Sequence, residues 1–351
     1  MEPGDTERPR GVSPPRRFRT RIALVALIVV ALATVAAGLA LARPHSTAIG
    51  TGFVVIDTNL AYQGEQAAGT GVVLTSSGEV LTNNHVIRGA TTIKVVVPAT
   101  GRSYTASVVG YDVSEDVALL RASGASNLKT ASLGNSSTVK LDVGQSVTAV
   151  GNAGGTGRLT SASGTVTGLA RAITVNNDQG GSERLTGLIE TNAAVRPGDS
   201  GGPLLNAGGQ VVGMDTAASV GYGGQQSATH DGYAIPITKA LSIAEQIQSG
   251  DVSATVHVGG TAFLGVEVAA NRYEGSGAVV ASVVPGSPAD AAGLIPDDLI
   301  TSFGGHAISS PAGLTAIVMT QQPGTPISAT YVDQTGAAQT TTVTLASGPP
   351  Q

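Results

Sequence analysis

Short hydrophobic runs alternate with polar turns along most of this chain. Between residues 69 and 237, β-branched runs are separated by turns rich in Gly, Asn and Ser. None of these runs has the length or the 3.6-residue period of a helix, so the pattern predicts an all-β barrel or sandwich. The predicted strands are Gly71–Leu74, Thr92–Val97, Ala106–Val109, Val117–Leu120, Ser146–Val150, Gly164–Thr167 and Val211–Met214.

A helical period first appears after these strands. Ile237, Leu241, Ala244 and Ile247 are spaced as on one face of a helix, and Gly250 follows in the position of a C-terminal cap. This spacing predicts a helix over 238–248. The next residues, 250–260, are small and polar, which is typical of a linker.

A second compact unit of strands and helices is expected at 261–347. Ser287 and Pro288 match the N-cap and first position of a helix. The other expected elements are strands around Leu264–Val268 and Ala278–Val283, a hairpin at Gly304-Gly305 and a helix over Ser310–Met319.

The N-terminal 42 residues have a different pattern. Residues 1–21 hold six Arg against three acidic residues, a net charge of +3, and residues 22–42 form a run of 21 residues without a charge. A membrane-spanning helix needs about 20 such residues, and a basic flank keeps its end in the cytoplasm. The pattern predicts a cytoplasmic tail (1–21), a transmembrane helix (22–42) and an extracytoplasmic remainder. The alternative is a signal cleaved after Ala42, since Ala40-Leu41-Ala42 fits the A-x-A cleavage pattern and would give a secreted form.

Composition narrows the class of protein. The 351 residues include 48 Gly and no Cys, and only 12% are charged, against about 25% in an average soluble domain. These values argue against a charge-rich disordered chain and a coiled coil, and the missing Cys excludes disulfides and thiolate metal sites. Residues 44–351 carry 12 basic and 21 acidic residues, a net charge of −9, so nucleic acid is not an expected partner.

A Gly-rich turn with a serine at its centre spans Arg196–Leu204, in the order RPGDSGGPL. A nucleophilic serine needs a backbone that turns its Oγ into a cleft and N–H groups aimed at the developing oxyanion. The flanking glycines permit that turn at Ser200, and the N–H groups of Gly198 and Ser200 are the expected oxyanion-hole donors. The particular order Gly-Asp-Ser-Gly-Gly-Pro favours a catalytic nucleophile over an ordinary turn.

His85 is the expected general base. It follows an apolar run and ends a predicted strand, where rigid backbone would hold a base over a cleft. The other histidines lie in polar or Gly-rich stretches and are not expected to take part: His45, His230, His257 and His306.

Asp116 is the acid expected to orient His85. It directly precedes the apolar strand Val117–Leu120, and a buried carboxylate persists only when it is paired and hydrogen-bonded. The neighbouring Asp112 and Glu115 are expected on the solvated turn.

The chain order His85, Asp116, Ser200 is that of two-barrel serine proteases. With TNNHV at 82–86, DVALL at 116–120 and the segment 190–203, the chain resembles a trypsin-fold protease of the HtrA/DegP family, of the membrane-bound or secreted actinobacterial type. The resemblance covers residues 69–237. It implies a mainly β protein with a chymotrypsin-like double β-barrel at 43–249, a Ser-His-Asp triad, and neither cofactor nor metal.

The resemblance also implies a substrate pocket. The position six residues before the nucleophile lies at the base of the S1 pocket in this family, and here it is Ala194. The segment that contains Tyr233, Ala234 and Ile235 resembles the strand along one side of that pocket. Without an acid at Ala194, a small or medium aliphatic P1 side chain is expected. Asp199 departs from the Asn that many HtrA members have before the nucleophile, and no partner for it is evident in the sequence.

The second unit resembles a PDZ domain of the bacterial kind over 261–347. In that family the loop containing Phe263, Leu264, Gly265 and Val266 binds a peptide carboxylate through backbone N–H groups, and the peptide adds as a strand. Asp297 stands where Gly is usual in this stretch.

Two classes of function remain. The first is an exported serine endopeptidase, regulated by its PDZ domain, that acts on unfolded or damaged envelope proteins; homotrimers are common in the family. The second is a catalytically silent peptide-binding or chaperone-like protein on the same fold. An intact His85, Asp116 and Ser200 favours the first.

Overall fold

The computed structural model describes residues 50–62, 64–135, 140–176, 182–218, 232–253, 255–270 and 276–351. The basic tail and the transmembrane helix predicted at 1–42 lie outside these residues, as do His45 and His230. No helix within the described ranges is long and apolar enough to cross a membrane.

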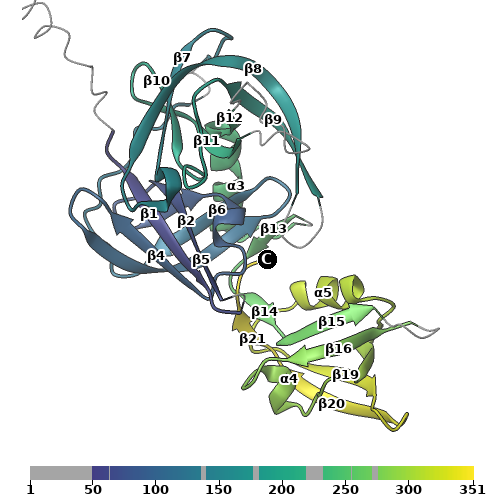
Figure 1. The fold of residues 1–351 in the computed structure, drawn as a ribbon. Coiled ribbons are helices and arrows are strands. Elements are labelled where there is room, and N and C mark those ends of the chain that lie inside the picture. The colour runs from purple at the N-terminus through teal and green to yellow at the C-terminus, as the bar shows by residue number, and fades with distance from the viewer. Residues whose placement is uncertain are drawn as a thin grey trace, which may run out of the picture. The chain divides into compact units, whose positions relative to one another are not determined.

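The first strands form a closed antiparallel barrel, which we call barrel 1 (Figure 1). Its strands follow the order β5-β4-β1-β2-β3-β6, and pairing of β5 with β6 closes it. The bounds are β1 (Phe53–Leu60), β2 (Glu65–Val73), β3 (Glu79–Thr82), β4 (Thr92–Val97), β5 (Arg102–Asp112) and β6 (Val117–Ala122). A short helix, α2 (Asn84–Ile87), follows β3.

A second closed barrel, barrel 2, has the strand order β10-β11-β12-β9-β8-β7. Its elements are β7 (Ser146–Gly151), η1 (Ala153–Gly155), β8 (Thr160–Asn176), β9 (Ser182–Thr191), β10 (Pro203–Asn206), β11 (Val211–Ala218) and β12 (Gly232–Pro236). The predicted all-β class is therefore confirmed, with most strands longer than their apolar runs. The strands are longer because pairing extends into polar residues that a hydrophobic pattern does not register.

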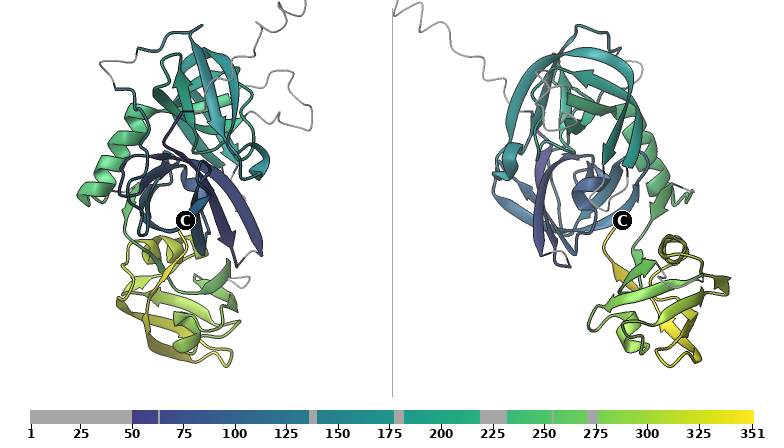
Figure 2. Two further views of the ribbon diagram at one scale, coloured as in Figure 1. Left: turned by 90° about the vertical axis from the view of Figure 1, so that its left-hand side faces the viewer. Right: turned by 45° about the vertical axis from the view of Figure 1, so that its right-hand side comes forward.

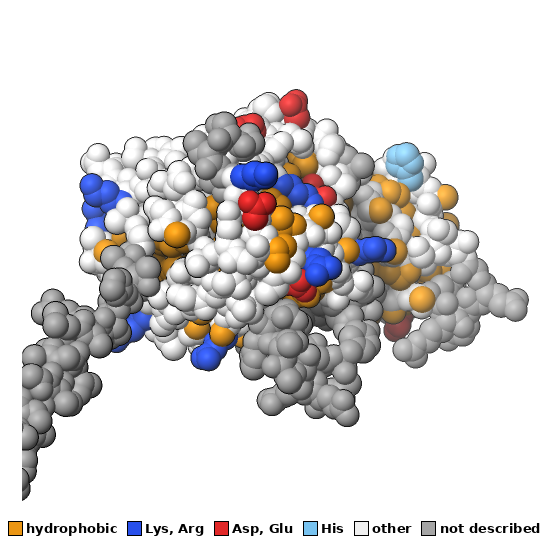
Figure 3. Space-filling view, turned by 90° about the horizontal axis from the view of Figure 1, so that it is seen from above, with side chains coloured by type: hydrophobic (Ala, Val, Ile, Leu, Met, Phe, Trp, Pro, Cys, Tyr) orange, Lys and Arg blue, Asp and Glu red, His pale blue; other side chains and the backbone are white. Residues whose placement is uncertain are grey.

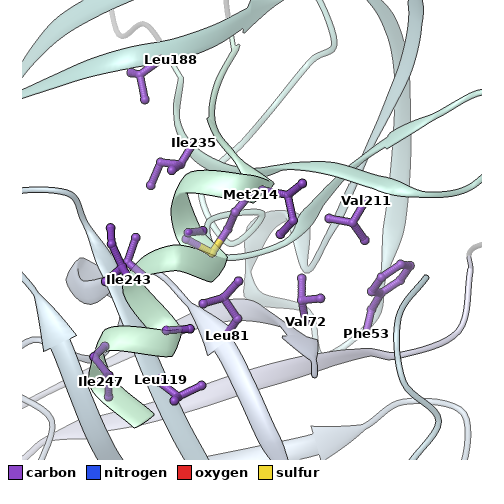
Figure 4. Packing of buried hydrophobic residues seen from close by; sticks show 14 of the residues in the cluster. Phe53, Val72, Leu81, Leu119, Leu188, Val211, Met214, Ile235, Ile243 and Ile247 are labelled. Atoms are coloured by element: carbon purple, nitrogen blue, oxygen red, sulfur yellow. The ribbon is translucent and has the colours of Figure 1, made fainter. Parts of the chain in front are cut away.

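Helix α3 (Ile237–Ser249) crosses the outside of both barrels and covers their shared core (Figure 2). The sequence predicted it over 238–248, and Gly250 ends it in the left-handed conformation with φ 79°. Side chains from both barrels and from α3 meet in one cluster, which includes Val72, Leu81, Met214 and Ile243 (Figure 4). This apolar cluster joins the two barrels, and the candidate site lies where they meet.

The residues expected to be a plain linker contain a strand. β13 (Val256–Val258) pairs with β5 of barrel 1, and Val256 is buried in the shared core. The alternation of Val256, His257 and Val258 was too short to predict a strand, because only the neighbouring edge of β5 provides the pairing.

The second unit has its own core and an antiparallel sheet in the order β15-β16-β17-β19-β20. Its elements are β14 (Thr261–Phe263), β15 (Val266–Ala270), β16 (Ala278–Val283), α4 (Pro288–Ala291), β17 (Leu299–Phe303), β18 (His306–Ala307), α5 (Pro311–Met319), β19 (Pro326–Val332), β20 (Ala338–Thr344) and β21 (Ala346–Gly348). Ser287 caps α4 as the sequence predicted, and Ser310, the first residue of the predicted second helix, caps α5. Each hydroxyl accepts the backbone N–H of the residue three positions further along the chain.

The surface reflects the low charge content. One face, seen from above, is mostly uncharged and carries scattered side chains of both signs (Figure 3). Charged residues make up 12% of the chain, so this face offers no extended basic surface.

Candidate active site

Ser200 lies in a tight turn between β9 and β10, where glycine conformations are needed. Gly198 and Gly201 have φ values of 96° and 80°, in the left-handed region. The turn is tied to β11, because the N–H of Gly201 donates to the carbonyl of Asp215 at 2.8 Å. A Cβ on Gly198 would collide with the carbonyl oxygen of Asn152, so this position excludes every other residue.

Thr70 of β2 holds the same turn from barrel 1. Its N–H donates to the carbonyl of Ser200, and its hydroxyl donates to the carbonyl of Gly198, both at 2.8 Å. The same hydroxyl accepts the N–H of Asn152 at 2.9 Å. Thr70 is fully buried, and nothing in the sequence distinguished it from the other threonines.

His85 and Asp116 face each other as predicted. His85 Nδ1 lies 2.8 Å from Asp116 Oδ2, and the backbone N–H of His85 donates to Asp116 Oδ1 at 3.0 Å. One prediction about His85 was wrong: the residue does not end a strand but lies in the first turn of α2, three residues beyond the end of β3. A helical turn brings the backbone N–H and the ring of His85 to the same carboxylate, which a strand would not do.

Further hydrogen bonds hold both the side chain and the backbone of Asp116. Thr216 Oγ1 of β11 donates to Oδ2, and the Asn83 side-chain amide donates to the Asp116 carbonyl at 2.9 Å. Asp116 has φ 54°, a strained value for a residue other than glycine, and these contacts offset the strain. Thr216 and Asn83 are site residues that the sequence did not reveal.

The other two acids of this turn behave differently from each other. Asp112 was predicted on the solvated side, but it is buried, and its carboxylate accepts the Ser114 hydroxyl at 2.7 Å and the Glu115 N–H at 3.1 Å. It is buried because it closes the turn that presents Asp116. Glu115 lies nearer the surface and pairs with Lys239.

The electrostatics of His85 suit a base that must become charged. Burial acts to lower the pKa of the imidazole, but the charge of Asp116 and its hydrogen bond outweigh burial, so the pKa is raised above its ordinary value. Ser200 Oγ donates to the Thr216 carbonyl at 3.5 Å. Among the described residues no hydrogen bond joins Ser200 to His85, so the Oγ must rotate before it gives up its proton.

Among the described residues, the predicted oxyanion donors have no acceptor. Neither the N–H of Gly198 nor that of Ser200 makes a hydrogen bond within the described part of the chain. Such N–H groups beside a nucleophile can bind the oxygen of an attacked carbonyl.

The residues predicted to line the substrate pocket have different surroundings. Ala194 is half-buried, directly beside the buried Ala193. Tyr233 is half-buried, and its hydroxyl donates to Glu190 at 3.2 Å. Ala234 and Ile235 are fully buried in the barrel 2 core and the shared core, respectively.

The predicted peptide-binding loop joins β14 to β15. Phe263 and Val266 are half-buried, Leu264 is buried, and Gly265 has φ 86°. Ser287 supports the loop, because its hydroxyl donates to the Gly265 carbonyl at 3.3 Å. No cluster of three or more His, Asp or Glu residues that could hold a metal ion occurs among the residues the structure describes.

A glycine-rich turn that carries Ser200, a His–Asp pair, and backbone N–H groups without a partner among the described residues lie where the two β-barrels meet. This arrangement fits a trypsin-like serine peptidase site. The family model for a trypsin-like peptidase domain matches residues 69–214, and that for a PDZ domain matches residues 262–345. The chain belongs to the HtrA-type serine protease family, and the predicted membership is confirmed.

Individual relatives agree with this assignment. Serine protease PepD of Mycobacterium tuberculosis is 34% identical over 306 residues, which cover 83% of this chain and 63% of the relative. The periplasmic pH-dependent serine endoprotease DegQ of Escherichia coli is 36% identical, over 75% of this chain and 56% of the relative. The solved structure of the HtrA-type protease AlgW with a tripeptide is 30% identical with a TM-score of 0.50, and covers 87% of this chain and 96% of that one.

The chain spans less than two thirds of the length of these curated relatives. Residues 182–214 of the peptidase match contain the nucleophile turn, and residues 262–266 of the PDZ match contain the peptide-binding loop. Both predicted sites therefore lie inside the matched segments.

Proposed function

We propose that this chain is a serine endopeptidase in which Ser200 is the nucleophile, His85 the general base and Asp116 the orienting carboxylate. The observation that carries the proposal is the 2.8 Å contact between His85 Nδ1 and a carboxylate that Thr216 also binds. That contact fixes the tautomer with Nδ1 protonated, so Nε2 is free to accept a proton.

The reaction follows from this geometry. Ser200 Oγ attacks the scissile carbonyl and passes its proton to His85 Nε2, while Asp116 stabilises the imidazolium. The N–H groups of Gly198 and Ser200 stabilise the oxyanion of the tetrahedral intermediate. His85 then protonates the leaving amine, and a water molecule activated by the same imidazole hydrolyses the acyl-enzyme.

The substrates we propose are unfolded or damaged proteins of the cell envelope, cleaved after small or medium aliphatic side chains. The half-buried Ala194 and Tyr233 would line the P1 site, with the strand that contains Ala234 and Ile235 along one side. None of these four residues is acidic, so none would attract Lys or Arg. Peptide carboxylates would bind at the loop Phe263–Val266, in line with the tripeptide named in the AlgW structure.

The location and boundaries are also proposals. Relatives named as periplasmic proteases support an extracytoplasmic catalytic domain. The apolar run 22–42 would anchor it to the membrane, or would be removed after Ala42 in a secreted form. We propose domain bounds of 43–249 for the protease, 250–260 for the linker and 261–347 for the PDZ domain, and a homotrimer as the assembly.

The test compares the wild type with Ser200→Ala on an unfolded protein substrate, with labelling by a serine-directed phosphonate. Ser161→Ala is the matched control, because Ser161 is an exposed serine of β8 in the same barrel. The wild type and Ser161→Ala should cleave and be labelled, whereas Ser200→Ala should do neither. Equal cleavage by all three proteins, or no labelling of the wild type, would instead favour the silent peptide-binding alternative.

A further inference from the structure

Two buried acids adjoin the turn that carries Ser200 and take no part in the triad. Asp199 precedes Ser200 and is 4% exposed, and Asp215 of β11 is fully buried. Asp199 Oδ2 accepts the Arg196 N–H at 2.9 Å. Within the described residues, Asp199 Oδ1 and both carboxyl oxygens of Asp215 have no hydrogen-bond partner.

The backbone ties both acids to the same turn. The N–H of Asp215 donates to the Gly202 carbonyl, and the N–H of Gly202 donates to the Asp199 carbonyl, each at 2.8 Å. Gly201 donates to the Asp215 carbonyl over the same distance. Movement of either acid therefore moves the residues on both sides of Ser200.

The side chain of Asp215 faces the interior of barrel 2. Met214, its neighbour on β11, points into the shared core between the barrels (Figure 4). Successive side chains of a strand point to opposite faces, so Asp215 points the other way, next to its cross-strand partner Ala234. Ala234 belongs to the apolar cluster inside barrel 2. An ionised carboxylate without a partner is strongly disfavoured in such surroundings.

Few charged groups act on this pair. Burial raises the pKa of Asp215 well above its ordinary value, and the charge of Asp199 raises it further. Burial also raises the pKa of Asp199, opposed by the hydrogen bond and the charge of Arg196.

The remaining titratable groups nearby have other partners. On the opposite face of β11, Thr216 binds Asp116, which holds His85. Strand β12 pairs with β11, and β9 pairs with β12 in turn. Tyr233 of β12 donates to Glu190 of β9, which also pairs with Arg171 of β8. None of these groups neutralises Asp215.

We propose that Asp199 and Asp215 share one proton, directly or through one water molecule, and that this protonated pair positions the nucleophile turn. One acid is then a neutral donor and the other a carboxylate acceptor, which satisfies oxygens that otherwise have no partner. Both are positioning residues, and the proposal deepens the proposed function, because it assumes that Ser200 is the nucleophile.

A rise in pH should release the shared proton to solvent and leave two like charges behind Ser200. Both folded-state pKa values are raised, so the stabilising effect is fully present below the unfolded value of about 4 and is lost as pH rises through the folded values. The catalytic rate should show a decline on the alkaline side from the same deprotonation.

The test uses the full chain with Asp215→Asn, Asp215→Ala and, as a control, Asp298→Asn. Asn mimics the protonated acid, because its amide donates a hydrogen bond without a charge. Asp298 is a buried acid of the second unit that also has an unpartnered oxygen. Denaturant midpoints are measured in the Ser200→Ala background from pH 4 to 9, so this arm does not depend on activity.

With Asp199 and Asp215 both present, the denaturant midpoint should fall as the pH rises, and the Asp298→Asn control should behave in the same way. In Asp215→Asn the midpoint should change much less with pH. A carboxylic acid C=O stretch in the infrared spectrum should disappear in the same variant. With active Ser200, Asp215→Ala should lower kcat at least tenfold with little change in KM, and Asp215→Asn should restore kcat and remove the alkaline decline. The same pH profile in wild type and Asp215→Asn would overturn the proposal, as would an infrared spectrum without the acid band.

Discussion

The hydroxyl of Thr70 is the point at which barrel 1 holds the nucleophile turn of barrel 2, and it can be removed with little change of shape. Thr70→Val keeps the branched side chain and the backbone bond to the Ser200 carbonyl. It deletes the donor to the Gly198 carbonyl and the acceptor of the Asn152 N–H. The predicted effect is therefore confined to two backbone groups.

The magnitude follows from the burial of those groups. A buried polar group left without a partner costs about 1–3 kcal/mol. Asn152 is fully buried, so its N–H should carry a large share of that cost, whereas Gly198 is half-buried and its carbonyl can bind water. We expect Thr70→Val to lower the free energy of unfolding by roughly 2–4 kcal/mol. The displaced turn would hold the oxyanion less well. If this raises the activation barrier by about 1.4–2.8 kcal/mol, kcat falls about 10–100-fold.

The assay pairs denaturant unfolding with steady-state kinetics, and Thr58→Val is the control. Thr58 is another buried threonine of barrel 1, but its hydroxyl donates only to the Ala67 carbonyl of the adjacent strand. Thr58→Val should therefore lose little kcat. Equal kcat values for the two variants would show that Thr70 does not position the turn. Equal free energies of unfolding would refute the argument that the Gly198 carbonyl and the Asn152 N–H are left without partners.

Three further predictions concern Asp116, the orienting carboxylate of the triad, and the second unit. Asp116 raises the pKa of His85, so Asp116→Asn should lower that pKa and move the acidic limb of the kcat/KM profile to lower pH. The same substitution should reduce kcat about 10⁴-fold. A pH–rate profile and an NMR titration of His85 measure these effects, and an unchanged histidine pKa would contradict this reasoning. Ser310→Ala should destabilise α5 by about 1 kcal/mol through loss of its cap, seen in hydrogen exchange, whereas the exposed Ser309→Ala should change it by under about 0.5 kcal/mol. Asp297→Gly should raise the free energy of unfolding by about 0.5–1 kcal/mol in denaturant titration, because Asp297 has φ 73°, and a lower value would show that its side chain stabilises the turn.

Local signals explain which elements the sequence could predict. Thr92–Val97 and Ala278–Val283 have the predicted bounds, because both are short runs rich in Val between turn residues. The N-cap Ser287 was likewise evident, since a cap depends on residues within one helical turn. Strand β13 was not predicted, because its pairing comes from a strand about 145 residues earlier in the chain.

The residues of the candidate site also differ in whether a local sequence signal marks them. Distinctive short motifs made it possible to predict Ser200 and His85 as members of the site, and Asp116 could be predicted from its place beside an apolar strand. Thr70 and Thr216 could not, because a threonine in a strand is common and its role depends on what the opposite barrel places against it.

Asp199 and Asp215 show why a departure from a family pattern can be noticed in a sequence but not explained by it. Asp199 stood out before Ser200, but its counterpart is 16 residues away on a strand that looked like ordinary core. The alternation of β11 places Thr216 against the triad carboxylate on one face and Asp215 in the barrel 2 interior on the other. One strand thus supports both the general-base pair and the buried acids, and its hydrogen bonds to Gly201 and Gly202 connect both to Ser200. A change in the charge of the buried acids would act on the nucleophile through these backbone bonds without a change in the triad itself.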